Sequence, residues 1–190
     1  MHHCGLELSP LRAEPRDDAE QVTQALLGEP LQVLERQGTW LRVRTAYDYP
    51  GWIRAEAVAE GSGELPAARD GDIVAEARAY LGAPYEWGGM SKRGIDCSGL
   101  VHMAYRRLGR IVPRDADHQE DAASKISVTE LRPGDLVTYG EEGRANATHV
   151  AFWLGDGRIL HSTERDDANG VLEEPEPDDL AARRRFLLRL

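Results

Sequence analysis

The feature that most constrains this fold is a break near residue 60, where glycine, serine and proline interrupt all hydrophobic periodicity over residues 60–66. Before the break, short apolar runs are separated by turns, which predicts closely spaced strands. After it, helical patterns come first and strand patterns follow, which predicts helices packed on an antiparallel sheet. We therefore expect an α+β chain with a small β-barrel at 1–60, a linker at 61–69 and a second domain at 70–190.

Local patterns predict the individual elements. In the first part, the candidate strands are residues 6–8, 26–29, 31–34, 40–44 and 51–53. In the second part, an aspartate can cap a helix over 72–81, another helix begins near Cys97 and ends at Gly109, and a polar helical or loop stretch covers 115–125. The remaining expectations are strands at 136–139, 148–154 and 158–162, an acidic surface loop at 172–179, and a strand or helix at 184–190.

Composition is that of an ordinary globular protein, with 41% hydrophobic and 29% charged residues. The net charge of -10 argues against nucleic acid or an anionic membrane as a main partner, because both require a basic surface. The first thirty residues lack a basic start followed by an apolar run, so we expect a cytoplasmic protein. Of the two cysteines, Cys4 lies at an N-terminus expected to fray, so no structural disulfide is expected.

Cys97 lies where a glycine-flanked turn becomes an apolar-periodic helix. In the first turn of a helix, free N–H groups and the positive end of the helix dipole stabilise a thiolate. A cysteine at such a position is either a nucleophile or an inert core residue. The residues around it leave both readings open.

A cysteine nucleophile needs a base within hydrogen-bond reach and a third group that orients the base. Of the six histidines, His149 and His161 lie on the predicted hairpin. With a three-residue loop at 155–157, His161 faces Ala151 and becomes a diagonal neighbour of His149 on one face of the sheet. A two-residue turn would send His161 to the opposite face. Gly157 favours the three-residue loop, which requires a left-handed residue.

The same three side chains, Cys97, His149 and His161, form an alternative zinc site. No CxxC pair or closely spaced histidine pair supports such a site. We therefore expect no metal and no other cofactor.

Several motifs occur in an order that resembles the NlpC-type cysteine peptidases, papain-like enzymes that cut peptidoglycan peptides. The resemblance covers residues 70 to about 165. The motifs are Tyr85-Glu86-Trp87-Gly88-Gly89, Gly94-Ile95-Asp96-Cys97-Ser98-Gly99, Pro113-Arg114-Asp115, Thr148-His149-Val150-Ala151, Gly155-Asp156-Gly157 and His161-Ser162. The resemblance implies a papain-like fold for this part of the chain.

Position by position, the resemblance implies that Cys97 is the nucleophile, His149 the general base and His161 the residue that orients the base. It also implies that Tyr85 belongs to the wall of the active site. Asp96 and Ser98, which flank the nucleophile, would line the substrate groove. Many relatives have a serine after the Pro-Arg-Asp run, where this chain has alanine.

Residues 22–29 and 49–53 resemble bacterial SH3-like domains, in particular those of the YkfC-like subgroup. In that subgroup the barrel closes one end of the groove and helps to bind the free amine of an N-terminal L-alanine. The resemblance assigns this role to Glu29 and Tyr49, together with Asp96. The alternative for Glu29 and Tyr49 is that they are ordinary surface residues of strands.

The expected activity is hydrolysis of the bond between γ-D-glutamate and an L-diamino acid in peptidoglycan-derived peptides with a free N-terminal L-alanine, as in murein peptide recycling. One rival is a secreted cell-wall hydrolase that uses its SH3-like domain for wall binding. The other is a catalytically inactive protein that binds wall peptides. No oligomeric state follows from the sequence.

Overall fold

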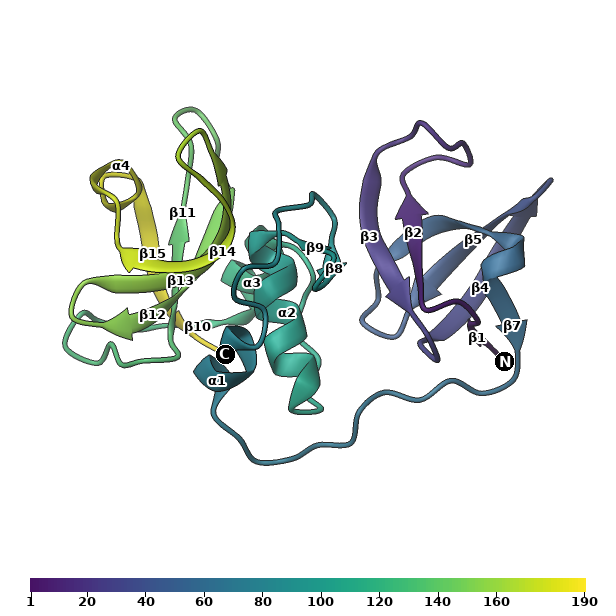
Figure 1. Cartoon of the computed structure of the whole chain (residues 1–190), viewed down its shortest axis with the longest axis horizontal. Coiled ribbons are helices and arrows are strands. Elements are labelled where there is room, and N and C mark those ends of the chain that lie inside the picture. Colours follow the sequence, from purple (N-terminus) through teal and green to yellow (C-terminus); the bar gives the residue numbers. More distant parts are fainter.

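The computed structural model describes residues 1–190. Figure 1 shows two units joined by an extended segment: a strand-rich unit at the N-terminus and a second unit in which α2 and α3 lie between an antiparallel sheet and the first unit. The predicted α+β organisation, with a small barrel followed by helices on an antiparallel sheet, is confirmed.

The first unit is a curved seven-stranded sheet in the order β3-β2-β6-β5-β4-β1-β7. Its core contains Leu11, Val43 and Ile53, all fully buried. Cys4 is also fully buried in this core, so the expectation of a frayed N-terminus is wrong: the chain start pairs as a strand with β4 and β7. The elements are β1 (His2–Cys4), β2 (Leu8–Arg12), β3 (Gln21–Leu26), β4 (Pro30–Gln37), β5 (Trp40–Thr45), β6 (Pro50–Arg54), a 3-10 turn (Ala55–Ala57) and β7 (Val58–Glu60).

The helices of the second unit follow the predicted pattern but differ in extent. Helix α1 (Ile73–Arg78) begins where the Asp72 side chain accepts a hydrogen bond from the amide of Val74, and it is shorter than predicted. Helix α2 (Cys97–Arg107) has every residue from Cys97 to Arg106 buried, because it is enclosed by the sheet and the barrel. The remaining elements are β8 (Met90–Ser91), β9 (Gly94–Ile95) and α3 (Ala116–Ala122).

The second sheet has the order β10-β15-β11-β12-β13-β14. The prediction of a surface loop at 172–179 is wrong, because residues 168–175 form β14, paired along its whole length with β13. The strands are β10 (Ser124–Lys125), β11 (Leu136–Tyr139), β12 (His149–Gly155), β13 (Arg158–Arg165), β14 (Ala168–Pro175) and β15 (Arg184–Arg189), with the short helix α4 (Asp178–Ala181) before the last.

The β12–β13 hairpin does not have the predicted three-residue loop. Gly155 pairs with Arg158, so the turn consists of Asp156 and Gly157, both with positive φ as a type I′ turn requires. A bulge between Trp153 and Gly155 adds one residue and restores the register expected of the longer loop. The predicted register of β12 and β13 beyond the bulge is therefore right, although the predicted turn is wrong.

Buried polar contacts join the two units. The Arg106 guanidinium on α2 donates to Glu29 of the barrel at 2.9 Å, and Arg114 Nε donates to Thr23 Oγ1 at 3.2 Å. Tyr47 of the barrel packs edge-on against His102 of α2, with ring centroids 4.5 Å apart. These contacts hold the barrel against the helices in a defined position.

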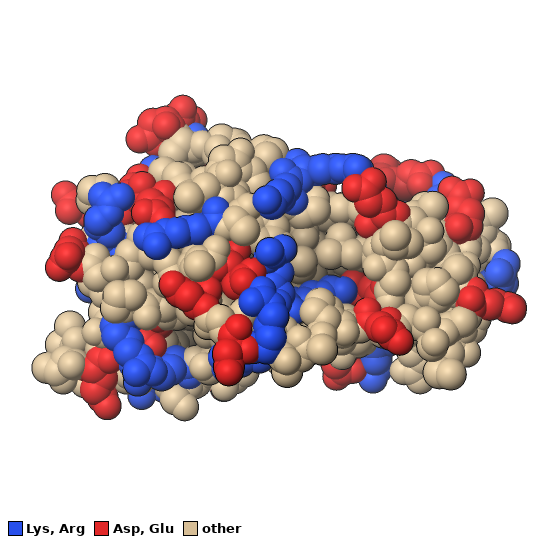
Figure 2. All heavy atoms as spheres, turned by 60° about the horizontal axis from the view of Figure 1, so that its bottom comes forward, with Lys and Arg blue, Asp and Glu red and all other residues tan.

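Charged side chains of both signs are interspersed on the face drawn in Figure 2. No helix in the structure has the length and apolar character needed to cross a membrane.

Candidate active site

Cys97 lies at the first turn of α2, in a cavity of about 440 Å³ between the barrel and the helices. The Asp96 side chain caps the helix by accepting a hydrogen bond from the amide of Gly99 at 2.6 Å. This cap fixes the direction of the first turn, and with it the position of Cys97, a residue that is 8% exposed.

His149 and His161 lie side by side on β12 and β13. His149 Nε2 is 2.8 Å from His161 Nδ1, and the two rings meet edge-on. Because Nε2 of His149 is occupied by this contact, its Nδ1 is the ring nitrogen left for another group. The backbone of the next residue, Val150, lies close enough to Cys97 to lower the pKa of its thiol, so the start of β12 lies beside the nucleophile.

The structure changes the expectation that the helix start lowers the pKa of the thiol. Burial, followed by the neighbouring Asp96 carboxylate, raises the pKa of Cys97 to about 12, and the amides of Val150 and Ser98 offset only part of this. Burial, followed by His161, lowers the pKa of His149 to about 3. Both shifts favour the uncharged forms, the thiol of Cys97 and the neutral imidazole of His149. A neutral imidazole can accept the thiol proton during attack, as a general base does.

A buried polar network lies under the nucleophile. Arg114, 1% exposed, donates to both carboxylate oxygens of Asp96 at 2.9 and 2.7 Å and to Ser98 Oγ at 2.9 Å. It also donates to the carbonyl of Gly89 at 3.1 Å. With these and Thr23, Arg114 makes five hydrogen bonds, so none of its donors points into the groove. Asp96 and Ser98 both line the cavity that contains Cys97, and both belong to this network.

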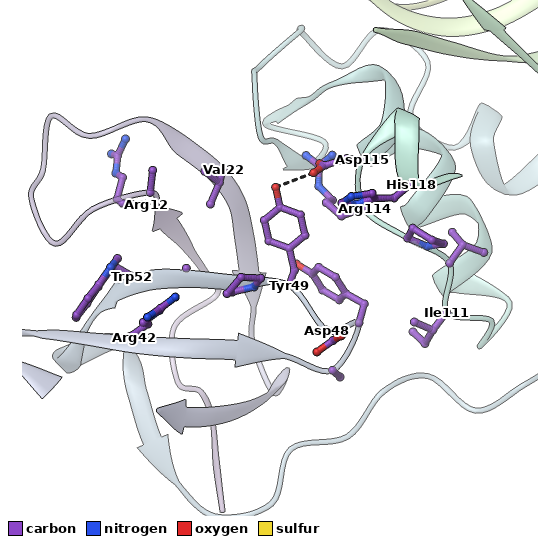
Figure 3. A pocket seen from close by; sticks show the side chains of 17 residues that line it. Arg12, Val22, Arg42, Asp48, Tyr49, Trp52, Ile111, Arg114, Asp115 and His118 are labelled. Atoms are coloured by element: carbon purple, nitrogen blue, oxygen red, sulfur yellow. Dashed lines mark hydrogen bonds between the residues drawn. The ribbon is translucent and has the colours of Figure 1, made fainter. Parts of the chain in front are cut away.

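Tyr49 closes the barrel end of the groove. Its hydroxyl donates to Asp115 Oδ2 at 2.8 Å, as the dashed line in Figure 3 shows. A second cavity, of about 840 Å³, lies on the other side of this contact and contains neither Cys97 nor His149. The Tyr49–Asp115 hydrogen bond therefore forms part of the wall between the two spaces.

The rim of the groove joins the two units. Trp87, 61% exposed, donates its indole N–H to Glu20 Oε1 at 2.9 Å. Glu20 belongs to the barrel and Trp87 to the segment before β8, so the contact spans the mouth of the groove.

Tyr85 does not line the cavity that contains Cys97. It lines a smaller cavity of about 290 Å³ together with His149 and Arg165. Burial, followed by the nearby Cys97, raises the pKa of its phenol. Cys97 lines the groove toward the barrel, whereas His149 lines the smaller cavity. The groove and the smaller cavity share two lining residues, Glu141 and Thr148.

The structure does not place Glu29 in the groove. Its side chain is completely buried, and Oε2 accepts hydrogen bonds from Arg106 at 2.9 Å and from the amide of Leu26 at 3.2 Å. The assignment of Glu29 to amine binding is therefore corrected: it belongs to the ion pair between the two units. The acidic residue that the barrel presents to the groove is Glu20.

Sequence reasoning missed three groups at the site. Glu20 lies in a barrel loop and carries no local signal. Asp115 belongs to the Pro-Arg-Asp run but was given no role of its own. Glu174 accepts from His161 Nε2 at 2.8 Å. It was missed because its strand was predicted to be a loop, and the pairing of β13 with β14 would have placed it near His161.

A helix-borne cysteine packed against a histidine-bearing antiparallel sheet is the architecture of papain-like enzymes. Residues 82–174 match the NlpC/P60 family, and residues 11–58 match the bacterial dipeptidyl-peptidase SH3 domain. The chain belongs to the NlpC/P60 family, which includes peptidoglycan hydrolases, and has an SH3 domain before its NlpC/P60 domain.

Relatives in sequence and structure agree with this assignment. The gamma-D-glutamyl-L-lysine dipeptidyl-peptidase of Bacillus cereus is 28% identical over 163 residues, which are 83% of this chain and 49% of the relative. The chain thus spans about half the length of that protein. The crystal structure of the NlpC/p60 domain of the peptidoglycan hydrolase SagA matches with a TM-score of 0.52 and 34% identity, over 62% of this chain and 96% of the other. A crystal structure of an NlpC/P60 family protein from Bacillus cereus covers 99% of this chain and 62% of its own, with a TM-score of 0.59 and 23% identity, and shows the shared two-part fold.

Proposed function

We propose that this protein is a cysteine endopeptidase that hydrolyses the bond between γ-D-glutamate and an L-diamino acid in peptidoglycan-derived peptides with a free N-terminal L-alanine. The observation that carries the proposal is the position of Cys97 in a groove whose barrel end is closed by Tyr49 and Asp115. A closed end favours short released peptides over intact cell wall. This supports a role in peptide recycling, for which we propose a cytoplasmic location.

In the proposed reaction, His149 takes the thiol proton as Cys97 Sγ attacks the γ-carbonyl of D-glutamate. The resulting tetrahedral species collapses to a thioester when His149 returns the proton to the leaving amine. Water, deprotonated by His149, then attacks the thioester and regenerates the thiol. The lowered pKa of His149 keeps this base unprotonated before attack.

The acyl part of the substrate would occupy the groove toward the barrel. An ammonium removed from water requires carboxylate or other acceptor oxygens around it. Asp115, Glu20 and the Tyr49 hydroxyl offer such oxygens at this end. Asp96 also lines the groove, but its charge is balanced by Arg114. We therefore assign amine recognition mainly to Asp115 and Tyr49, with Glu20 in place of Glu29.

The leaving diamino acid would occupy the smaller cavity beside His149. His149 must reach the departing nitrogen to protonate it, and this cavity contains His149 and Tyr85. Charged groups of both signs, including Glu164 and Arg183, line it and can contact the polar ends of a diamino acid.

Mass spectrometry of defined tripeptides tests the proposal. L-Ala-γ-D-Glu-diaminopimelate should be cut to L-Ala-D-Glu and free diaminopimelate, and the N-acetylated tripeptide should be cut at least tenfold more slowly. Cys97→Ala should abolish cleavage, whereas Cys4→Ala, which removes the other thiol, should retain it. Cleavage by Cys97→Ala would overturn the proposed chemistry, and equal cleavage of both peptides would overturn amine recognition.

A further inference from the structure

Glu174 ends a chain of three hydrogen-bonded side chains that crosses adjacent strands of the sheet. His149 on β12 contacts His161 on β13 at 2.8 Å, and His161 Nε2 contacts Glu174 Oε1 on β14 at 2.8 Å. His161 pairs in register with Leu172, so Glu174, two residues further along β14, lies diagonally opposite on the same face.

Arg165 holds the Glu174 carboxylate in place. Its guanidinium donates to Oε1 at 2.7 Å and to Oε2 at 3.0 Å, a bidentate contact from the end of β13. Burial alone would raise the pKa of Glu174, but the hydrogen bonds from Arg165 and His161 outweigh it and lower the pKa. The carboxylate is therefore ionised at neutral pH and can only accept hydrogen bonds.

This acceptor decides which nitrogens of both histidines carry protons. Because Glu174 only accepts, His161 must donate its proton from Nε2, which leaves Nδ1 of His161 as an acceptor. His149 must then donate from its own Nε2 to that nitrogen. Its Nδ1 is left with a lone pair, the form that can take the proton of Cys97.

We propose that Glu174 is a positioning residue that sets the reactive tautomer of His149 through His161, with Arg165 fixing its carboxylate. This inference rests on the proposed function for its kinetic consequence only. The tautomer itself is a property of the free protein. Loss of the acceptor would allow His161 to carry its proton on Nδ1. His149 would then be protonated on Nδ1, where it could not act as a base.

Two substitutions at this position separate the acceptor from the charge. Glu174→Leu removes the acceptor. The Glu174→Gln amide can adopt two orientations. We expect the one that places its oxygen at the Oε1 site, because it keeps the contacts to both His161 and Arg165 Nη1. The reversed orientation keeps only the contact to Nη2. The matched control is Glu173→Gln on the opposite face of β14, where Glu173 pairs with Arg78 at 2.6 Å.

The direct readout is NMR of 15N-histidine-labelled protein, in which ring shifts report the protonated nitrogen. Wild type and Glu174→Gln should show both His149 and His161 as Nε2–H tautomers, and Glu174→Leu should show a raised Nδ1–H fraction in both rings. With the tripeptide as substrate, kcat of Glu174→Leu should fall about 10- to 100-fold, within what a general base contributes, with KM changed less than about twofold. Glu174→Gln should stay within about threefold of wild type, and Glu173→Gln should be unchanged.

An Nδ1–H tautomer of His149 in the wild type would overturn the inference without any variant. Unchanged ring shifts together with a kcat within about twofold for Glu174→Leu would also overturn it. Failure of the proposed function looks different: the wild type would then not cleave the peptide, while the tautomers would still answer the question about Glu174.

Discussion

Arg114 offers the sharpest test of how the two units and the nucleophile are held together. Its guanidinium makes five hydrogen bonds to four groups: Thr23 of the barrel, Gly89, Asp96 and Ser98. The proposed change is Arg114→Lys, which keeps the charge and much of the length. It replaces a fork of five donors by an ammonium with three.

The expected cost follows from that count. At least two of the five hydrogen bonds are lost, and their acceptors stay buried, because Arg114 is 1% exposed. A hydrogen bond that involves a charged group contributes about 1.5–3 kcal/mol, so the loss of two should lower the free energy of unfolding by about 3–6 kcal/mol. For a chain of this size the corresponding decrease in Tm is about 2–4 °C per kcal/mol, that is, at least about 6 °C.

Thermal unfolding followed by circular dichroism measures this effect. The matched control is Arg16→Lys, since the Arg16 side chain is 51% exposed and its ion pair with Glu14 lies at the surface. The control should change the free energy of unfolding by less than about 0.5 kcal/mol. A decrease in Tm of less than about 2 °C for Arg114→Lys would refute the reasoning, because the fork geometry would then contribute nothing beyond its charge.

Three further predictions concern the groove, the thiol and the contact between the units. Tyr49→Phe removes the hydrogen bond to Asp115 and should raise KM for free-amine peptides about two- to tenfold with kcat unchanged, as measured by steady-state kinetics; an unchanged KM would contradict it. The pKa of Cys97 is raised to about 12, above the unperturbed value of about 8.5. Its thiolate fraction, and therefore the rate of its alkylation by iodoacetamide, should keep rising with pH above about 8.5. A rate that reaches a plateau near neutral pH would contradict the raised pKa. Gly88→Ala should lower Tm more than Gly157→Ala. Both positions have positive φ, but an added Cβ meets a barrel carbonyl at 2.7 Å only at Gly88 and nothing within 4 Å at Gly157, so equal decreases would contradict the contact.

Local chemistry was enough to predict several parts of this molecule. An N-cap aspartate predicted α1, and apolar periodicity ending at Gly109 predicted α2, since both signals depend on neighbouring residues only. Short apolar runs beside turn residues predicted β11 and the strands of the hairpin. The hairpin register was right for a wrong reason, because a bulge at Leu154 supplied the residue that the shorter turn lacks.

Other parts required contacts between distant residues. The stretch around Glu174 is acidic and ends in proline, which is typical of a surface loop, yet it pairs with β13 as an edge strand. Glu29 was assigned to the groove by motif position, but it is buried against Arg106, far away in sequence. Neither side chain carries a local signal for its partner.

The sequence by itself determined the class of the protein, because the ordered motifs around Cys97, His149 and His161 leave few alternative chemistries. Only the tertiary structure decided which carboxylates serve the site. Glu20 and Asp115 reach the groove, Glu29 is buried in an ion pair, and Glu174 contacts His161. The physical reason is that a nucleophile and its base are marked by the turn and strand that carry them. The partner of a charged side chain is set instead by how the barrel, the helices and the edge strand pack together.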